Sequence, residues 1–403
     1  MDNYMDLDLE TPFQPLSPVK VENFKGRVDI IKKILRYMNK SLKCEVQHFF
    51  LTGSKGMGKT SVAEFIIEEI KKINMLSIYI SNKGNDSVEM LASNIIKSLI
   101  NKYPEENRIE KVKSWFGKHV SEIKFHGTTL SFNLDQQMQD NIKNDFLDYL
   151  LIAYEYLKVE YKGILIVIDD INGLSNSKEF VDWYKSFADT LNVEENYHLP
   201  LYFLLTSYPD KFDNMVLLEK SFGRLFHFAH VGELSDGEVK EFFKDSFKSV
   251  NLEINDDALE FITDYTSGVP LTMQYIGDSI FWNMTQNNIS IRDAKEGIIL
   301  ASKEIRSKQL RVLNRIKENI HEEILIKIAQ EKLEIFDYDD LKNVLTQHEF
   351  DYLEEFLNNM TEKNILKEEF NGTYKFVDKL DYTYYRIKSF EKLYTQSPHT
   401  TYF

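Results

Sequence analysis

Five short apolar runs recur between residues 48 and 231 of the chain. Each run is rich in residues that favour β-strands, and each is apolar at consecutive rather than alternate positions. Helix-period sequence separates the first four runs, whereas the stretch between the last two shows no clear helix. This pattern predicts an α/β fold with a five-stranded parallel sheet sandwiched by helices. The runs are HFFLTG (48–53), MLSIYIS (75–81), GILIVIDD (163–170), PLYFLLTS (200–207) and RLFHFAHV (224–231).

The connection between the second and third runs is long, and we expect an insertion in the sheet domain at about 84–160. It begins with two helical stretches. Next comes SEIKFHGTTLSFNL, which alternates like a small hairpin around its His-Gly pair. A long amphipathic helix is then predicted over about 137–160.

Beyond residue 231 the pattern is helical. Ser235 and Glu238 form a capping box at the start of one helix, and three more helical segments reach residue 305. Thr346 and Glu349 form a second capping box, ahead of EFDYLEEFLNNMTEK. The stretch ILKEEFNGTYKFV follows and predicts a hairpin, because its Asn-Gly pair suits a type I′ turn. Helix, helix, helix, hairpin is the order of a winged helix.

The elements group into an N-terminal arm and three domains. Prolines at every third position from Pro12 to Pro18 favour an extended, polyproline-like arm that is also acidic. The predicted limits are 1–22 for the arm, 23–231 for the sheet domain, 232–305 for a helical lid and 306–403 for a winged-helix domain.

Composition narrows the class of protein. Apolar residues make up 43% of the chain, which indicates a globular protein. The single cysteine, Cys44, excludes a disulfide within the chain and favours a cytoplasmic location. We find neither a signal-peptide pattern nor an apolar run near the ~20 residues that cross a bilayer, so no membrane is expected. The net charge of −15 means that nucleic acid could bind only through a local basic patch.

The segment GSKGMGKT after the first apolar run has the spacing of a phosphate-binding loop. Gly53, Gly58, Lys59 and Thr60 match G-x-x-x-x-G-K-[ST], at a strand-to-helix junction. Glycines let backbone N–H groups turn towards a polyphosphate, and the positive end of the next helix adds to that field. Lys59 would reach the β- and γ-phosphates and Thr60 would ligate Mg²⁺. The residues expected to bind ATP here are Gly53, Ser54, Lys55, Gly56, Met57, Gly58, Lys59, Thr60 and Ser61.

The third apolar run supplies two acids. Asp169 stands at the carboxyl end of the predicted strand, where ligands of parallel sheets bind, and it is the expected partner of Mg²⁺. Asp170 follows and is placed to orient or deprotonate an attacking water. Together with the loop, these acids indicate an ATPase that transfers the γ-phosphoryl group to water.

With these motifs, the chain resembles the AAA+/STAND branch of P-loop ATPases over about residues 22–390. It is most similar to the archaeal-type ATPases, which are related to origin-recognition ATPases. ENFKGRVDIIKKIL resembles the family's entry segment and implies that Gly26 and Arg27 lie near the adenine. SGVPLTMQYIG matches the G-x-P motif and implies that Gly268 and Pro270 lie against the base and ribose. PLYFLLTSYPD looks like the sensor-1 strand, placing Thr206 or Ser207 near the γ-phosphate.

The resemblance also implies a role for Arg224, in SFGRLFHF. An arginine at this place could stabilise the γ-phosphate of a neighbouring subunit; the alternative is an ordinary surface arginine. The sequence departs from fast motors at three points. Asp170 replaces the usual Glu, the sensor-1 strand lacks the usual Asn, and no sensor-2 arginine is evident. These departures favour slow hydrolysis and switching.

The winged helix does not favour DNA reading. Its candidate recognition helix, HEFDYLEEFLNNMTEK, is opposed to phosphates by its acids and has Lys363 as its one lysine. The acids brought towards phosphates would be Glu349, Asp351, Glu354 and Glu355. A basic stripe lies elsewhere, where Lys308, Arg311 and Arg315 share one face of a predicted helix. It could bind a nucleic-acid backbone or an acidic partner, or simply be a solvated linker.

Three functions stay open on this sequence. The first is a low-turnover ATP switch with Mg-ATP between sheet domain and lid, whose nucleotide state controls self-assembly or binding of a partner effector protein. The second is a DNA-associated ATPase that resembles origin-recognition or transposition regulators. The third is a nucleotide-loaded scaffold, for example in microbial defence.

Overall fold

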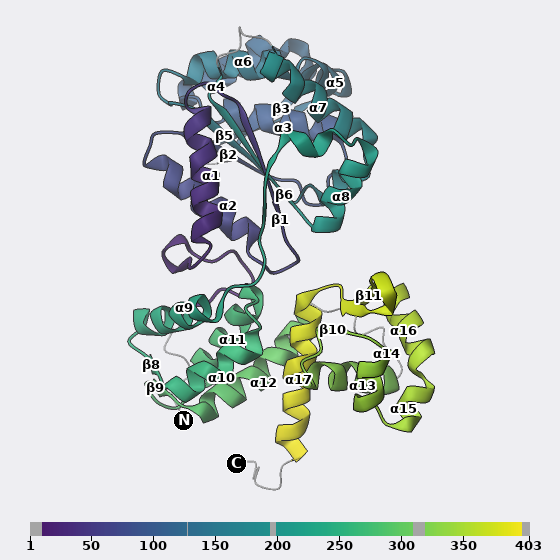
Figure 1. Cartoon of the computed structure of the whole chain (residues 1–403). Helices are drawn as coiled ribbons and strands as arrows, with labels where there is room; N and C mark the ends of the chain where they lie inside the picture. Colours follow the sequence, from purple (N-terminus) through teal and green to yellow (C-terminus); the bar gives the residue numbers. More distant parts are fainter. Residues whose placement is uncertain (1–9, 127, 194–198, 309–318, 397–403) are drawn as a thin grey trace. The chain divides into compact units, whose positions relative to one another are not determined.

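The computed structural model describes residues 10–126, 128–193, 199–308 and 319–396 of the chain (Figure 1). These residues form two compact units. One unit contains 27–53 and 59–231 and carries the parallel sheet. The other contains 54–58 and the described residues of 1–26 and 232–403, and holds the lid, the winged helix and the tip of the phosphate-binding loop. We call them the sheet unit and the lid unit.

All five apolar runs form strands of a single parallel sheet, which confirms the predicted α/β fold. Its order is β2-β5-β6-β1-β7, so β1 lies between β6 and the edge strand β7. The strands are β1 (Gln47–Thr52), β2 (Leu76–Ser81), β5 (Ile164–Asp169), β6 (Leu201–Ser207) and β7 (His227–His230).

Helices cover both faces of this sheet, and alternate residues of the central strands face each layer. On one face, Tyr202 of β6 donates from its hydroxyl to the carbonyl of Ile34 in α1 (Val28–Ser41). Helix α2 (Lys59–Lys71) packs near α1 against β2, β5 and β6. On the other face, Phe203 of β6 packs in a core shared with α3 (Val88–Ile100) and α7 (Lys178–Val193). Both faces of the central strands β5, β6 and β1 are buried, which explains why their runs lack a polar alternation.

The insertion after β2 contains the expected helices and hairpin. It comprises α3, α4 (Glu105–Phe116), η2 (Gly117–His119), the antiparallel pair β3 (Val120–His126) and β4 (Thr129–Leu134), then α5 (Gln136–Asn144) and α6 (Phe146–Leu157). The predicted single helix over 137–160 is wrong, because the chain breaks at Asp145, which has φ −106° and ψ 30°. The aromatic side chain of Phe146 is buried directly after this break.

One helix of the sheet unit was not predicted. Between β6 and β7 the chain forms α8 (Pro209–Leu218), with proline at its first turn, where the missing N–H costs nothing. Met215 is the buried residue of this helix, whereas Leu217 is exposed. A ten-residue helix with an exposed leucine has a blurred apolar stripe, which explains the miss. A short turn, η4 (Phe222–Leu225), leads into β7.

The lid consists of four helices and a short parallel strand pair. They are α9 (Asp236–Ser249), β8 (Glu253–Ile254), α10 (Asp256–Thr266), α11 (Pro270–Asn283), β9 (Asn288–Ile289) and α12 (Ile291–Lys308). The predicted capping box of Ser235 and Glu238 is present at α9.

The described part of the N-terminal arm packs within the lid unit. Phe13 is buried among Phe242, Phe243 and Phe247 of α9. A Cβ at Gly277 would lie 2.2 Å from the Phe13 ring, so α11 needs a glycine there. The arm is not uniformly extended: it turns where the N–H of Ser17 donates to the carbonyl of Gln14, and it ends in η1 (Val21–Asn23).

The C-terminal part has the winged-helix order. Strands β10, β12 and β11 form an antiparallel sheet in that order. Asn371 and Gly372 both have φ of 72°, as the predicted turn requires. The candidate recognition helix is broken at Tyr352 into α15 and α16. The elements are α13 (Asn319–Gln330), β10 (Ile335–Phe336), α14 (Tyr338–Val344), α15 (Gln347–Asp351), α16 (Leu353–Glu362), β11 (Leu366–Glu368), η6 (Phe370–Gly372), β12 (Tyr374–Phe376) and α17 (Lys379–Gln396).

Within the described ranges, none of the helices combines the length and apolar character that crossing a bilayer requires. The basic stripe predicted around Arg311 and Arg315 lies outside the described residues.

Candidate functional site

The segment 53–60 forms a tight loop between β1 and α2. Gly56 and Gly58 have φ of 79° and 86°, the left-handed region that glycine adopts most easily. Gly53 is needed for a different reason, since a Cβ there would lie 2.4 Å from the carbonyl oxygen of Val231. The Lys59 ammonium donates to the Gly53 carbonyl at 2.7 Å and lies 4.7 Å from the centre of the Tyr208 ring. Lys59 is thus held across the base of the loop.

Asp169, at the end of β5, has a carboxylate enclosed by hydroxyl groups. Thr60 of α2 donates to Oδ2 at 2.8 Å, and Tyr79 of β2 donates to the same oxygen at 2.7 Å. Thr206 of β6 donates to Oδ1 at 2.5 Å. The side chain is buried, with 6% of its residue surface exposed. Three elements therefore fix the orientation of this one carboxylate.

Asp170 is held differently. Its backbone is left-handed, with φ 60° and ψ 59°, at the start of η3 (Ile171–Leu174). Its N–H donates to the Thr206 hydroxyl at 2.9 Å, and its carboxylate accepts from the side-chain amide of Asn172. Thr206 consequently contacts both acids.

The two candidate sensor hydroxyls separate in the structure. Thr206 binds the acids, whereas the Ser207 hydroxyl donates to the carbonyl of Tyr208 at 2.9 Å. Side chains alternate along a strand, so neighbouring residues of β6 face opposite sides. Of the two residues put forward from the sequence, this geometry favours Thr206 over Ser207.

The remaining candidates of the ATP site in the lid unit pack closely together. A Cβ on Gly26 (φ 72°) would lie 2.4 Å from the Glu238 carboxylate, and one on Gly268 (φ 68°) would lie 2.3 Å from the Leu234 carbonyl. Pro270 begins α11. The next N–H, of Leu271, donates to the carbonyl of Gly56 at 3.1 Å. The lid therefore has a direct hydrogen bond to the phosphate-binding loop.

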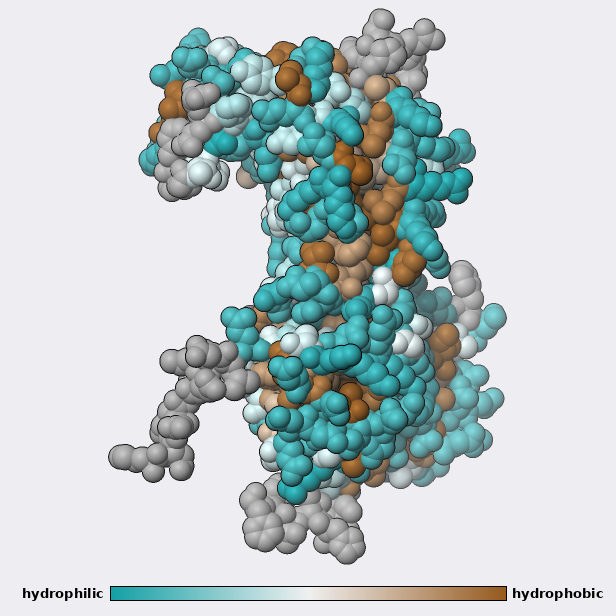
Figure 2. Space-filling view, turned by 90° about the vertical axis from the view of Figure 1, so that its left-hand side faces the viewer, coloured by the Kyte–Doolittle hydropathy of each residue, from teal (hydrophilic) through white to brown (hydrophobic). Residues whose placement is uncertain are grey.

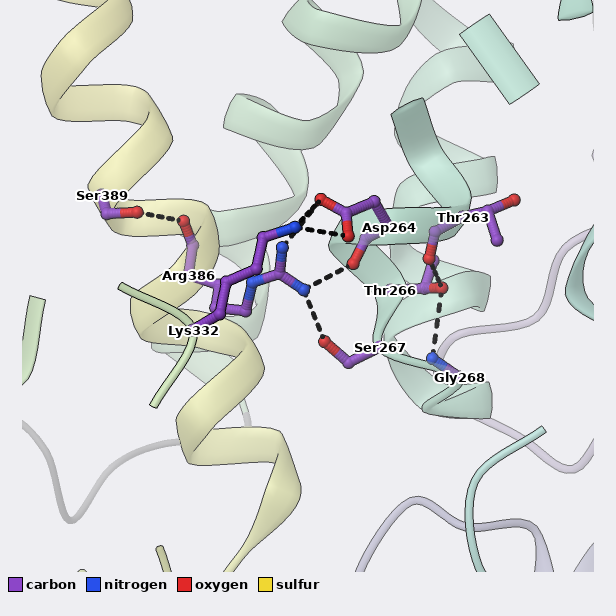
Figure 3. A network of polar contacts seen from close by, with 8 residues as sticks. All are labelled: Thr263, Asp264, Thr266, Ser267, Gly268, Lys332, Arg386 and Ser389. Carbon is purple, nitrogen blue, oxygen red and sulfur yellow. Dashed lines mark hydrogen bonds and ion pairs between the residues drawn. The ribbon is translucent and has the colours of Figure 1, made fainter. Parts of the chain in front are cut away.

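Arg386 of α17 is bound to the turn just before Gly268 (Figure 3). Its guanidinium donates to the carbonyl of Asp264 at 2.7 Å, to the Asp264 carboxylate at 2.8 Å and to the Ser267 hydroxyl at 3.2 Å. Lys332 pairs with the same carboxylate at 3.1 Å. Burial opposes ionisation of Asp264, but Arg386 and Lys332 outweigh it and hold its pKa below the usual value.

Two candidate arginines belong to the sheet unit. Arg224 is exposed in η4, one turn before the edge strand β7. Arg27 occupies the N-cap position of α1 with φ 62°, and its side chain makes no capping hydrogen bond there.

A family model described as an ATPase domain predominantly from Archaea matches residues 24–276. The chain belongs to this family. No curated protein matches it significantly. This membership, together with the loop and the acids, confirms an ATP-binding P-loop ATPase of the type that the motifs predicted.

Several solved structures share the fold at low sequence identity. The Walker-type ATPase PABY2304 of Pyrococcus abyssi is 18% identical, with a TM-score of 0.55 over 95% of this chain and 100% of that one. The ORC2 protein of Aeropyrum pernix, in ADPNP–ADP complexes, is 14% identical, with a TM-score of 0.53 over 93% and 96%. Cdc6p of Pyrobaculum aerophilum is 14% identical, with a TM-score of 0.50 over 94% and 98%.

The donor set of this ATPase fits magnesium. The Thr60 hydroxyl and the Asp169 carboxylate lie 2.8 Å apart, and both offer the hard oxygen ligands that Mg²⁺ prefers. Carboxylate and hydroxyl leave room in an octahedral shell for phosphate oxygens and water, as is usual for nucleotide-bound Mg²⁺.

Reasoning from the sequence did not propose two residues that lie near Asp169. Tyr79 follows an isoleucine in β2, and burial together with the Asp169 carboxylate raises the pKa of its hydroxyl well above the usual value. Glu64 lies one helical turn after Thr60, and burial together with Asp169 raises its pKa too. The signal for Tyr79 was its position near the carboxyl end of a strand, which becomes informative only once β2 and β5 are known to pair.

Proposed function

We propose that this ATPase is a slow molecular switch whose nucleotide state controls self-assembly or the binding of a partner effector protein. The observation that carries the proposal is the continuous set of contacts within the lid unit. It runs from the phosphate-binding loop through the start of α11 to the turn at Ser267, and from that turn to α17 of the winged helix.

Nucleotide binding falls to the loop 53–61. Its N–H groups and the N-terminus of α2 would bind the phosphates, and Lys59 would exchange the Gly53 carbonyl for phosphate oxygens. Thr60 and Asp169 would hold Mg²⁺, which when bound neutralises charge on the phosphates. Gly26, Arg27, Gly268 and Pro270 would bind the adenosine. The structure of the similar ORC2 protein of Aeropyrum pernix was solved in ADPNP–ADP complexes, which supports nucleotide binding here.

Slow turnover is supported by the setting of Asp170. Its carboxylate already accepts a hydrogen bond from Asn172, and its side chain is one methylene shorter than the glutamate that fast motors use. The bond from Asn172 restricts the directions in which the remaining acceptor sites of this carboxylate can orient an attacking water. We expect a turnover number below about 1 s⁻¹, at the low end for enzymes.

A change of bound nucleotide would be transmitted to the winged helix as a series of small movements. A γ-phosphate that draws in the loop moves the Gly56 carbonyl and with it the N-terminus of α11. Arg386 then transmits the movement to α17. Lys55 of the loop also acts on α17: burial and Asp378 raise the pKa of Asp381 to about 7, and Lys55 opposes them.

Assembly would use Arg224. Its exposure before an edge strand supports presentation of its guanidinium to the γ-phosphate of a neighbouring subunit, where it would stabilise transition-state charge. Direct DNA reading by the winged helix is not supported, because Asp351, Glu354 and Glu355 are exposed along α15 and α16.

Light scattering on the full chain tests the switch. We expect the mass to rise with a non-hydrolysed ATP analogue and Mg²⁺ and to stay at its resting value with ADP. Arg224→Ala should reduce hydrolysis, whereas Lys220→Ala, which removes an exposed cation nearby, should not. An unchanged monomer under all nucleotides, together with no change in binding of co-purified proteins, would reject the switch.

Mixing variants tests whether Arg224 acts on a neighbour. Arg224→Ala subunits keep their acids, and Asp170→Asn subunits keep their arginine. If Arg224 acts between subunits, a mixture hydrolyses ATP faster than either variant alone. Additive rates would show that Arg224 does not act in this way.

Asp170→Asn also separates the switch from a nucleotide-loaded scaffold. Loss of hydrolysis with intact ATP binding should trap the assembled or partner-bound state of a switch. A scaffold would show the same assembly and partner binding as the parent protein.

A further inference from the structure

Helix α1 carries a row of cations on its exposed side. Lys32, Arg36 and Lys40 follow one another at four-residue spacing, and Lys43 continues the row just beyond the helix. Residues at this spacing share one helical face, and the row spans about 16 Å at 1.5 Å per residue. All four side chains line one surface groove together with Leu35 and Asn39. We call these four residues the α1 cation row.

The α1 cation row lacks acidic partners. In the part of the chain that the structure describes, none of its four members forms an ion pair with a carboxylate. Some other lysines of the sheet unit, by contrast, are paired within their own helices. Lys72 pairs with Glu69 at 2.6 Å and Lys185 with Asp189 at 2.9 Å. The charge of the row is therefore not neutralised locally.

Neighbouring groups fix the row and add to its charge. Arg36 and Lys40 lie 6.0 Å and 5.5 Å from the centre of the Tyr37 ring, and that ring stacks on His227 of β7. Lys33, beside the row, donates to the carbonyl of Phe228 at 2.6 Å. The cations are thus tied to the edge of the sheet rather than spread along a free helix.

This local positive surface stands in a chain with a net charge of −15. Such a chain repels polyanions as a whole, so any attraction must come from an uncompensated patch. The α1 cation row is such a patch.

We propose that the α1 cation row binds the phosphate backbone of a nucleic acid. The chemistry of α1 favours this ligand over two others. Its apolar residues Ile34 and Met38 are buried against the sheet, which leaves no free apolar face to enter a membrane. The groove offers one apolar residue, Leu35, whereas protein partners are usually held by aromatic and apolar anchors. Lys and Arg without such anchors are the usual contacts of phosphates.

Fluorescence anisotropy with a labelled duplex of about 30 base pairs tests the proposal on the full chain. The variant Lys32→Gln/Arg36→Gln/Lys40→Gln removes three cations of the row. The matched control, Lys71→Gln/Lys72→Gln/Lys185→Gln, removes three ion-paired cations of the same unit and changes the net charge equally.

The parent protein and the control should bind with a log–log salt slope of about −3.6, the value for four phosphate contacts. The row variant should bind at least tenfold more weakly at about 50 mM salt, with a slope near −0.9. Thermal unfolding should be the same for both variants. ATP binding should be unaffected in both, which keeps this test separate from that of the switch.

Three results would overturn the proposal. The first is no duplex binding by the parent protein at about 50 mM salt. The second is equal binding by the row variant and the control, which would place any nucleic-acid site elsewhere. The third is row-dependent binding to phosphatidylserine vesicles without binding to the duplex, which would make a lipid surface the ligand.

Discussion

Two regions of the molecule offer positive charge to phosphates, and they are built in opposite ways. The loop 53–60 relies on backbone N–H groups, two glycines with positive φ and one lysine held at 2.7 Å from a carbonyl. The α1 cation row relies on four exposed side chains on one helical face. The loop presents backbone donors in a fixed geometry and little exposed charge. The row presents exposed charge along one helical face.

This difference predicts different selectivity. Fixed N–H groups select a ligand by geometry, so the loop should bind a triphosphate tightly and depend little on bulk salt. Exposed side-chain cations attract any regular array of phosphates and release counterions when they bind, so the row should bind weakly and respond steeply to salt. The same chemical group is thus recognised by shape in one region and by charge in the other.

Replacing Lys59 should have the largest effect on this comparison. Lys59→Ala removes the proposed charge-assisted contact to two phosphates, worth about 1.5–3 kcal/mol, so ATP affinity should fall about 10- to 150-fold. Duplex binding should stay the same. Calorimetric titration with ATP measures the first and anisotropy the second. The control Lys71→Ala, in the same helix, should change neither; a similar loss there would contradict a local role for Lys59.

The second largest effect should be a difference in salt dependence between duplex binding and ATP binding. Between about 50 and 200 mM salt, duplex affinity should fall about 100-fold for a slope of −3.6. ATP affinity with saturating Mg²⁺ should change by less than about fivefold, since the loop contacts are short and directional. Equal salt dependence of the two ligands would remove the distinction.

Acid should destabilise the parallel sheet that supports both the loop and the α1 cation row. His48 of β1 is fully enclosed, and burial, with a smaller effect of His227, lowers its pKa from 6.5 to about 3. The unfolded chain binds this proton between those two values and the folded chain does not. Stability therefore falls as the pH drops from about 6.5 towards 3, by about 2 kcal/mol at pH 5.

Denaturant unfolding at several pH values measures this effect. His48→Phe keeps a ring stacked on Phe203 and removes the titrating group, so its stability should depend less on acid. Exposed His348→Gln should keep the acid dependence of the parent. An unchanged slope in His48→Phe would assign the acid sensitivity to other groups.

Tyr79→Phe should have the smallest effect. It removes one of three hydroxyl donors to Asp169, a contact worth about 1 kcal/mol. The Mg²⁺ concentration needed for half-maximal binding of a fluorescent ATP analogue should rise about fivefold, with binding in excess Mg²⁺ unchanged. Tyr161→Phe, which lies before the amino end of β5 and so at the opposite end of that strand from the acids, serves as the control. Identical Mg²⁺ dependence in Tyr79→Phe would mean that Thr60 and Thr206 suffice to orient the carboxylate.

Local patterns were enough for much of the fold. Runs such as GILIVIDD indicated parallel strands because both of their faces are buried, and the capping boxes at Ser235 and Thr346 placed two helix starts correctly. The errors arose where tertiary packing decided. The helix expected over 137–160 breaks at Asp145, and α8 was missed because Leu217 faces solvent.

The candidate site divides in the same way. The sequence by itself determined the phosphate loop and the acid Asp169, because a glycine spacing and a strand end are properties of neighbouring residues. Only the tertiary structure decided that Thr206 rather than Ser207 contacts the acids and that Tyr79 joins them. It also decided that the α1 cation row has no carboxylate partner among the described residues. Each of these depends on which strands pair and which charges approach one another across the fold, and no local pattern of residues encodes such distances.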